Sequence, residues 1–325
     1  MAQTAPAQKV FILLPAYNDG ASLKLLLPRI KAATTGRDLE IIVVDDGSTE
    51  GAFKASMISQ NGLVGCVIEL VANYGQQPAI AIGMKFVASR MSENDLLIVM
   101  DADGEDPAEV IEALIDRAVH TKKPVVAARS GRSATFTFRL GYLIFKCLFA
   151  ILTGRSLNFG NFMCLQQGVV KRLVAMLSLS DSLPGTLLLS KLPIDRLPVR
   201  RNERLVGRSH MNVTGLIQHG LSCIRVFRKD VLIRLVLISL MLIFFLSAIA
   251  FAILIIKLYG IAVPGWTSLA LGIVGIFLLQ ILGFLFLAAI TQSSRKTDIH
   301  ISALDTKLVK VVHTKVASDT LVATD

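Results

Sequence analysis

Cysteine and histidine are scarce in this chain of 325 residues. The four cysteines (Cys66, Cys147, Cys164 and Cys223) lie far apart, and none belongs to a Cys-x-x-Cys pair. The five histidines include no His-x-x-x-His pair. These spacings argue against a disulfide framework and against a zinc site.

Phosphate-binding and export signals are also missing near the amino terminus. No Gly-x-Gly-x-x-Gly or Gly-Lys-Ser/Thr follows the first apolar run, residues 10–14, so neither a dinucleotide-binding fold nor a P-loop is supported. Residues 1–8 are polar and the apolar run is too short for a signal peptide. We therefore expect the amino-terminal part to stay in the cytoplasm.

Charge is absent from two long stretches, residues 235–256 and 267–290. Each stretch exceeds the roughly 20 residues that cross a bilayer as a helix. Together with a mean hydropathy of +0.61, they predict two transmembrane helices, joined by a short loop that contains Gly260 and Pro264. A buried hairpin in a soluble protein is the alternative, which such long uncharged runs disfavour.

Positive charge is concentrated just before the first apolar stretch. Residues 196–234 contain nine Lys or Arg and two acids, which gives +7 of the chain's formal +10. Basic flanks favour the cytoplasmic side of a membrane and attract anionic lipid headgroups. We predict a multi-pass membrane protein with its carboxyl terminus in the cytoplasm, and no nucleic acid partner.

Short apolar runs alternate with helical patterns in the first 130 residues. This alternation predicts an α/β fold with a Rossmann-like, open and mostly parallel sheet, in which ligands bind beyond the carboxyl ends of the strands. The expected strands are residues 10–14, 41–44, 66–71, 96–100 and 125–128, and the expected helices are residues 21–34, 52–60, 77–91 and 108–120.

Acidic residues follow the fourth expected strand. Asp101 and Asp103 are two residues apart, so in an extended segment their side chains point the same way and can share one divalent cation. Glu105 and Asp106 add negative charge. The alternative is a capped turn before a helix that begins near Pro107.

Three ordered motifs carry a resemblance to a known family. Residues 14–18 (Leu-Pro-Ala-Tyr-Asn), 43–48 (Val-Val-Asp-Asp-Gly-Ser) and 101–109 (Asp-Ala-Asp-x-x-Asp-Pro-x-Glu) resemble the signatures of family 2 glycosyltransferases with the GT-A fold. With two spans following, residues 9–290 are most similar to the polyprenyl-phosphate glycosyltransferases, the group of dolichyl-phosphate mannose synthases and bacterial undecaprenyl-phosphate sugar transferases. The resemblance implies transfer of a sugar from a nucleotide-sugar to a polyprenyl phosphate lipid.

Such a reaction releases a nucleoside diphosphate, and a divalent metal, Mg²⁺ or Mn²⁺, can neutralise the charge that develops on it. Asp103 is the first choice as direct ligand, Asp101 contacts metal or ribose, and Glu105 is the third candidate. The resemblance implies that Asp46 binds the donor base, while Asp45 caps the next turn as an alternative. The remaining donor-binding candidates are Pro15, Tyr17, Asn18 and Asp19. For Tyr17, a place in a plain strand-to-helix turn is the alternative.

The acceptor side is assigned from basic residues. Residues 204–210 (Arg-Leu-Val-Gly-Arg-Ser-His) resemble the family's Arg-x-x-Gly-x-Ser-Lys loop, which implies that Arg204, Ser209 and His210 bind the acceptor phosphate or donor diphosphate. The resemblance places Arg129 near the phosphates, and together with Asp101, Asp103 and Arg204 it completes the catalytic candidates. Arg139 is a further candidate contact to the acceptor phosphate. It lies in the apolar helical stretch 136–152, which we expect in the membrane interface together with residues 213–227. Burial of the stretch in the core of the domain is the alternative.

No catalytic base stands out, and a polyprenyl phosphate needs none because it is already an anion, so we expect in-line displacement with inversion. Asn161 and Met163 replace both charged residues of the family's Gly-Asp-Phe-Arg-Leu segment, and Gly104-Glu105 stands where the family usually has Leu-Gln. Both departures suggest an unusual donor, or a catalytically silent nucleotide-sugar-binding protein. A glycosyltransferase of the same fold with another lipid or glycan acceptor is the other alternative. The absence of Gln-x-x-Arg-Trp counts against a processive polysaccharide synthase.

The chain is expected to divide into four parts. These are a nucleotide-sugar-binding part, an acceptor-side part, a membrane hairpin and a cytoplasmic tail, namely residues 1–130, 131–230, 231–292 and 293–325. In the tail, residues 308–312 either form a short strand, with a second subunit as one possible partner, or stay unpaired. Homo-oligomers assembled through the membrane helices are a further expectation.

Overall fold

A computed structural model describes residues 8–129, 136–206, 213–260, 263, 265–293 and 309–314. The chain divides into two compact units, each described by itself. The sheet unit contains residues 1–144, 156–226 and 301–325, and the helical unit contains residues 145–155 and 227–300.

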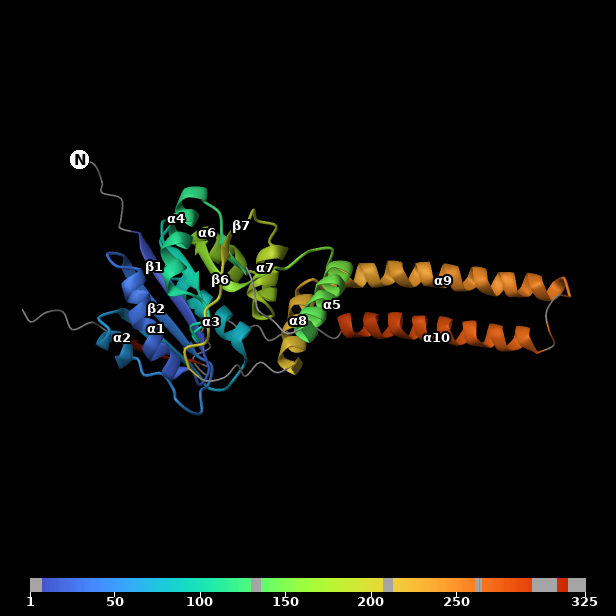
Figure 1. Ribbon diagram of the computed structural model, residues 1–325, viewed down its shortest axis with the longest axis horizontal. Helices are drawn as coiled ribbons and strands as arrows, with labels where there is room; N and C mark the ends of the chain where they lie inside the picture. The colour runs from blue at the N-terminus through green and yellow to red at the C-terminus, as the bar shows by residue number, and fades with distance from the viewer. Residues whose placement is uncertain are drawn as a thin grey trace, which may run out of the picture. The chain divides into compact units, whose positions relative to one another are not determined.

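The described part of the sheet unit contains an eight-stranded mixed sheet with the order β7-β5-β6-β4-β1-β2-β3-β8 (Figure 1). Its strands are β1 (Lys9–Ala16), β2 (Asp38–Asp45), β3 (Val64–Leu70), β4 (Leu96–Val99), β5 (Val125–Arg129), β6 (Phe159–Gln166), β7 (Asp195–Val199) and β8 (Val309–Thr314). Strands β4, β1, β2 and β3 are parallel, as are β5 and β7, whereas β6 is antiparallel to both of its neighbours.

Both faces of the sheet are covered because the side chains of its central strands alternate between two apolar layers. In β1, Ile12 packs with α1 and α4 on one face, whereas Leu13 packs with α3, α6 and α7 on the other. The helices of this unit are α1 (Gly20–Ala33), α2 (Ser56–Gln60), α3 (Gln76–Ala88), α4 (Ile111–Thr121), α6 (Gln167–Val174), α7 (Leu183–Leu189) and α8 (Val213–Val226), with short 3-10 turns at Ala108–Val110 and Leu177–Ser180. The predicted α/β sheet class is confirmed.

The tail strand β8 pairs with the edge strand β3 of the same chain, in antiparallel register with Val311 opposite Ile68. The sequence left open whether such a strand would pair at all, or pair with another subunit. Strands β6 and β7 were not predicted either. Each of the five predicted strands is present, with ends that differ by no more than a few residues.

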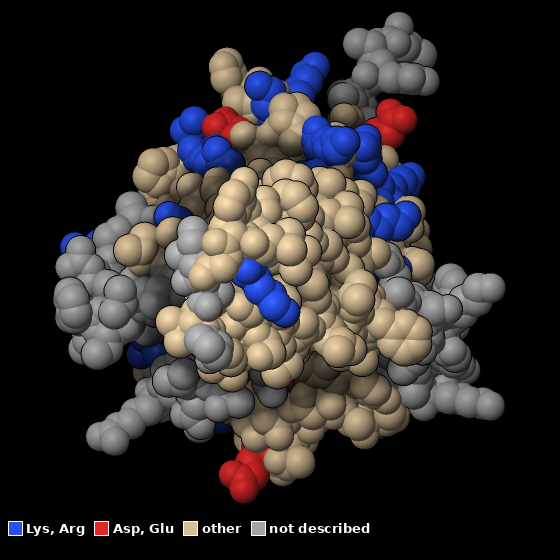
Figure 2. Space-filling model, turned by 90° about the vertical axis from the view of Figure 1, so that its right-hand side faces the viewer, with Lys and Arg blue, Asp and Glu red and all other residues tan. Residues whose placement is uncertain are grey.

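The helical unit contains the end of α5 (Phe136–Thr153) and two long helices, α9 (Arg228–Leu258) and α10 (Trp266–Ser293). The rings of Phe149 and Phe227 form a T-shaped pair with their centroids 5.8 Å apart, which ties α5 to the start of α9. Helices α9 and α10 pack side by side, and both are long and apolar enough to cross a membrane. Figure 2 shows a central surface that is mostly tan, whereas Lys and Arg gather along the top of the view.

Candidate active site

The loops after β1 and β2 are joined to each other at the carboxyl edge of the sheet. Asn18 has a positive φ of 55°, and its side-chain carbonyl accepts hydrogen bonds from the N–H groups of Thr49 and Glu50 at 3.0 and 3.1 Å. Its own N–H donates to the Ser48 hydroxyl at 2.9 Å. Asn is among the residues that tolerate this backbone conformation. In this structure Asn18 therefore holds the second loop in place.

Main-chain groups hold the acidic pair at the end of β2. The two carboxylate oxygens of Asp46 accept the N–H groups of Tyr74 and Gly75, both at 2.8 Å. Burial raises the pKa of the Asp46 carboxyl, and these two hydrogen bonds oppose that rise. Asp45 accepts the N–H of Ser48 at 2.9 Å, so it caps the turn, the alternative that the sequence left open.

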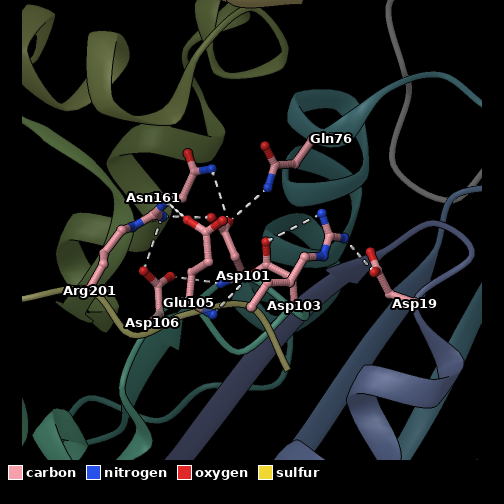
Figure 3. Close-up of polar contacts among 9 residues, drawn as sticks. Asp19, Gln76, Asp101, Asp103, Glu105, Asp106, Asn161 and Arg201 are labelled. Atoms are coloured by element: carbon pink, nitrogen blue, oxygen red, sulfur yellow. Dashed lines mark hydrogen bonds and ion pairs between the residues drawn. The ribbon is translucent and has the colours of Figure 1, made fainter. Parts of the chain in front are cut away.

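The acidic loop, residues 101–106, follows β4 and is shaped by its own carboxylates (Figure 3). Asp106 accepts the N–H of Asp101 at 2.9 Å, and Asp103 accepts the N–H of Glu105 at 3.0 Å. Gly104 between them has a φ of +80°, a conformation that residues with a Cβ rarely adopt. The loop thus turns back on itself and brings four carboxyl groups close together.

Side chains from three other segments hold the Asp101 carboxylate (Figure 3). One oxygen accepts the amide groups of Gln76 at 2.7 Å and Asn161 at 3.4 Å, and the other accepts the Arg201 guanidinium at 2.9 Å. Gln76 begins α3, Asn161 lies in β6, and Arg201 follows β7. The carboxylate is therefore the meeting point of elements that are remote in sequence.

Two arginines from residues 201–205, the arginine segment, enter the acidic loop. Arg201 bonds Glu105 at 2.7 Å and Asp106 at 3.1 Å in addition to Asp101. Arg204 bonds Asp19 at 2.7 Å and lies 4.0 Å from Asp103. Arg201 was not among the predicted site residues, because nothing in its local sequence distinguishes it from the other arginines nearby.

Burial and crowding raise the pKa values of two carboxyl groups in the acidic loop. Burial, and next to it the Asp101 charge, raises the pKa of Asp103 to about 6. Burial and Asp101 also raise the pKa of Asp106, while Arg201 opposes that rise. Burial lowers the pKa of Arg201, but the surrounding carboxylates outweigh it and raise that pKa above its ordinary value. The acidic loop therefore carries an excess of negative charge, which Arg201 and Arg204 only partly balance.

That excess suits a divalent cation of the predicted kind. Among the described residues no three Asp, Glu, His or Cys side chains converge as a closed metal cage. Mg²⁺ does not require one, since it is commonly held by one or two carboxylates together with phosphate oxygens. Asp101 and Asp103 fit that mode. Glu105 bonds Arg201, and its predicted metal contact remains a prediction.

The other predicted residues are placed as follows. Pro15 is buried near the end of β1, and Tyr17 is 42% exposed beside Asn18. Arg129 ends β5 and Arg139 belongs to α5, with side chains outside the described part of the structure. Ser209 and His210 lie outside the described residues altogether.

A buried pair of amides supports Asn161. Gln77 donates to the Asn161 carbonyl at 3.1 Å and accepts the N–H of Leu183 at 2.7 Å. Both amide side chains are less than one-tenth exposed, so each bond is made away from water. The neutral Asn161, which replaces the family's charged residue, therefore links the buried Gln77 amide to the Asp101 carboxylate.

The fold and the carboxylate site together define an α/β domain of the GT-A type. Residues 11–168 match the family model described as glycosyl transferase family 2. This match supports a family 2 glycosyltransferase and, with it, glycosyltransferase activity.

Three groups of solved structures show a remote likeness. Mannosyl-3-phosphoglycerate synthase from Rubrobacter xylanophilus is 16% identical with a TM-score of 0.45, covering 68% of this chain and 73% of that chain. Glucosyl-3-phosphoglycerate synthase from Mycobacterium tuberculosis, in complex with Mn²⁺, UDP-glucose and phosphoglyceric acid, is 16% identical with a TM-score of 0.48, covering 69% and 80%. S. aureus TarS, residues 1–349, is 14% identical with a TM-score of 0.41, covering 60% and 59%.

Proposed function

We propose that this chain is a membrane-bound, inverting glycosyltransferase that moves a sugar from a nucleoside-diphosphate donor to polyprenyl phosphate at the cytoplasmic face of a bacterial membrane. The observation that carries the proposal is a family 2 match and two long apolar helices in one chain. In the most apolar stretch of each helix only 6% is buried. A core helix of a soluble protein would be mostly buried, so this surface favours contact with lipid.

The donor side rests on the acidic loop. Asp101 and Asp103 would hold Mg²⁺ or Mn²⁺, which supplies positive charge to the leaving diphosphate. Asp46 and Asn18 shape the neighbouring loops, where we place the nucleotide base. Arg204 lies between the carboxylates of Asp19 and Asp103. A phosphate group could replace these carboxylates as the partner of its guanidinium.

The acceptor side needs orientation more than proton transfer, because a lipid phosphate is an anionic nucleophile at neutral pH. The sequence places Ser209 and His210 shortly after Arg204, and Arg139 in the apolar helix α5. The Arg139 guanidinium and the His210 imidazole would offset the phosphate's charge, and with the Ser209 hydroxyl they would hold it in line with the sugar.

The orientation in the membrane is supported by strand pairing as well as by charge. Strand β8 follows α10 in sequence yet pairs with β3 of the sheet unit. If α9 and α10 both cross the membrane, this pairing favours both ends of the hairpin in the same compartment. With the basic flank before α9, this favours a cytoplasmic sheet unit and tail.

The test is transfer of labelled sugar by the purified full-length protein in vesicles. A panel of nucleotide-sugars is offered with Mn²⁺ or Mg²⁺ and one of three acceptors: undecaprenyl phosphate, 3-phosphoglycerate or a glycan. We expect one donor to label the lipid fraction. Label only on a soluble acceptor would contradict the lipid assignment, and nucleotide binding without transfer to any acceptor would indicate a silent binding protein.

A matched pair of variants controls the assay. Asp103→Ala is expected to abolish metal-dependent transfer. Glu93→Gln removes an exposed carboxylate shortly before β4 and is expected to leave transfer unchanged.

A further inference from the structure

The arginine segment is attached to the acidic loop through main chain, side chain and apolar contact. The N–H groups of Asn202 and Leu205 donate to the carbonyls of Glu105 at 2.8 Å and Asp103 at 3.0 Å. Leu205 also lies against Gly104, where an added Cβ would come within 2.4 Å of the Leu205 side chain. The two segments are about a hundred residues apart in sequence, so this docking is a tertiary contact.

Glu105 faces the arginine segment with both its main chain and its side chain. Its carboxylate bonds one guanidinium nitrogen of Arg201 at 2.7 Å, and both side chains are less than one-fifth exposed. The other nitrogen of the same guanidinium bonds Asp101 at 2.9 Å and Asp106 at 3.1 Å. A planar guanidinium fixes its two sides relative to each other. Holding one side therefore sets where the other side meets Asp101.

We propose that Glu105 is a positioning residue that acts through Arg201: it fixes the guanidinium that orients Asp101 and keeps the arginine segment docked. This gives Glu105 a role other than the metal contact predicted from sequence. Residues 207–210 follow this segment after Val206, and the family resemblance implies acceptor-phosphate contacts among them. Glu105 thus couples the donor side of the site to the acceptor side, and this part of the inference rests on the proposed function.

Limited trypsin digestion of the full-length protein tests the docking without any assumption about activity. Mass spectrometry follows the rate of cleavage after Arg204. Trypsin cuts only when the segment leaves the loop. Losing a charged hydrogen bond should increase opening, so Glu105→Gln and Arg201→Gln should each raise the cleavage rate about tenfold or more. Asp195→Asn breaks the exposed Arg117–Asp195 pair nearby and should leave the rate unchanged.

The double variant decides whether Glu105 acts through Arg201. If it does, Glu105→Gln with Arg201→Gln cleaves no faster than Arg201→Gln alone, whereas independent roles make the two effects multiply. An unchanged rate in Glu105→Gln, or multiplied effects, overturns the proposal. Should Glu105→Gln cleave throughout the chain because it is unfolded, Glu105→Asp replaces it, since the shorter arm keeps the charge but not the 2.7 Å contact.

Steady-state kinetics separate the positioning role from metal binding. For Glu105→Gln we expect an apparent Mn²⁺ constant within about twofold of the unaltered protein and an acceptor KM raised about tenfold. A raised Mn²⁺ constant with an unchanged acceptor KM would contradict the proposal and support a metal ligand. If the unaltered protein transfers no sugar, the proposed function fails, while the trypsin result still decides the docking.

Discussion

Two carboxylates, Asp46 and Asp101, lie at the same edge of the sheet, after the two strands that flank β1, and they are held in opposite ways. Main-chain N–H groups hold Asp45 and Asp46. Side chains from three other segments hold Asp101. Main-chain donors cannot leave without refolding a loop, whereas side-chain partners can be exchanged for a ligand.

The difference assigns Asp46 to the framework and supports the proposal that Asp101 belongs to the chemistry. The Asp46 carboxylate fixes the loop before α3, so its loss should weaken the fold. The carboxylates of the acidic loop repel one another, so their charge is maintained at a cost to stability, as is common at functional sites. The following predictions test this contrast, from the largest expected effect to the smallest.

Asp103→Ala should reduce sugar transfer by about a hundredfold or more, because it removes electrostatic stabilisation of the leaving diphosphate. The rate is measured with saturating donor, acceptor and Mn²⁺. The same variant should lose little thermal stability, because relief of repulsion within the acidic loop offsets the lost acceptor of the Glu105 N–H. Retention of more than a tenth of the activity would remove Asp103 from the catalytic machinery.

Asp46→Ala should destabilise the protein by about 1–3 kcal/mol, because it leaves two main-chain N–H groups without their acceptor. Chemical unfolding followed by circular dichroism measures this difference. Asp38→Ala, at the exposed opposite end of β2, is the control and should show no comparable loss. Equal stability of the two variants would refute the framework role of Asp46.

Gly104→Ala should cost about 1–2 kcal/mol, since the position requires a positive φ. An added Cβ would also collide with Leu205, so trypsin cleavage after Arg204 should accelerate. Gly36 also has a positive φ, +85°, but nothing lies within 4 Å of an added Cβ, so Gly36→Ala is the control. This control should lose stability without faster cleavage after Arg204; equal cleavage in both variants would show that Leu205 is not packed on the loop.

Asp101→Asn should change stability least, by about 0.5 kcal/mol or less, because relief of repulsion offsets the lost ion pair with Arg201. Transfer should nevertheless fall strongly. Unfolding midpoints of Asp101→Asn and Asp46→Ala, measured side by side, test the contrast directly. A larger loss in Asp101→Asn would reverse the assignment of framework and chemistry.

Local sequence was sufficient to predict the five strands of the first 130 residues and the position of the acidic loop. Apolar runs identified five strands, and the spacing of Asp101 and Asp103 identified the acidic loop, because both signals lie within a few residues. The turn-capping role of Asp45 was also among the alternatives weighed.

The remaining features depend on which segments meet in space. Arg201 reaches Asp101 from a hundred residues away, and only the antiparallel placement of β6 beside β4 brings Asn161 to the same carboxylate. The sequence near β8 carries the strand signal but not the identity of its partner, β3. Such contacts follow from topology, which no single segment encodes.

The most direct test of the central claim is the mass of undecaprenyl phosphate recovered after incubation with the protein, Mn²⁺ and the donor panel. We predict that one donor adds the mass of one sugar to the lipid with the unaltered protein, and that Asp103→Ala forms about a hundredth of that product or less in the same time. An unmodified lipid with every donor, or more than a tenth as much product with Asp103→Ala, would contradict the account.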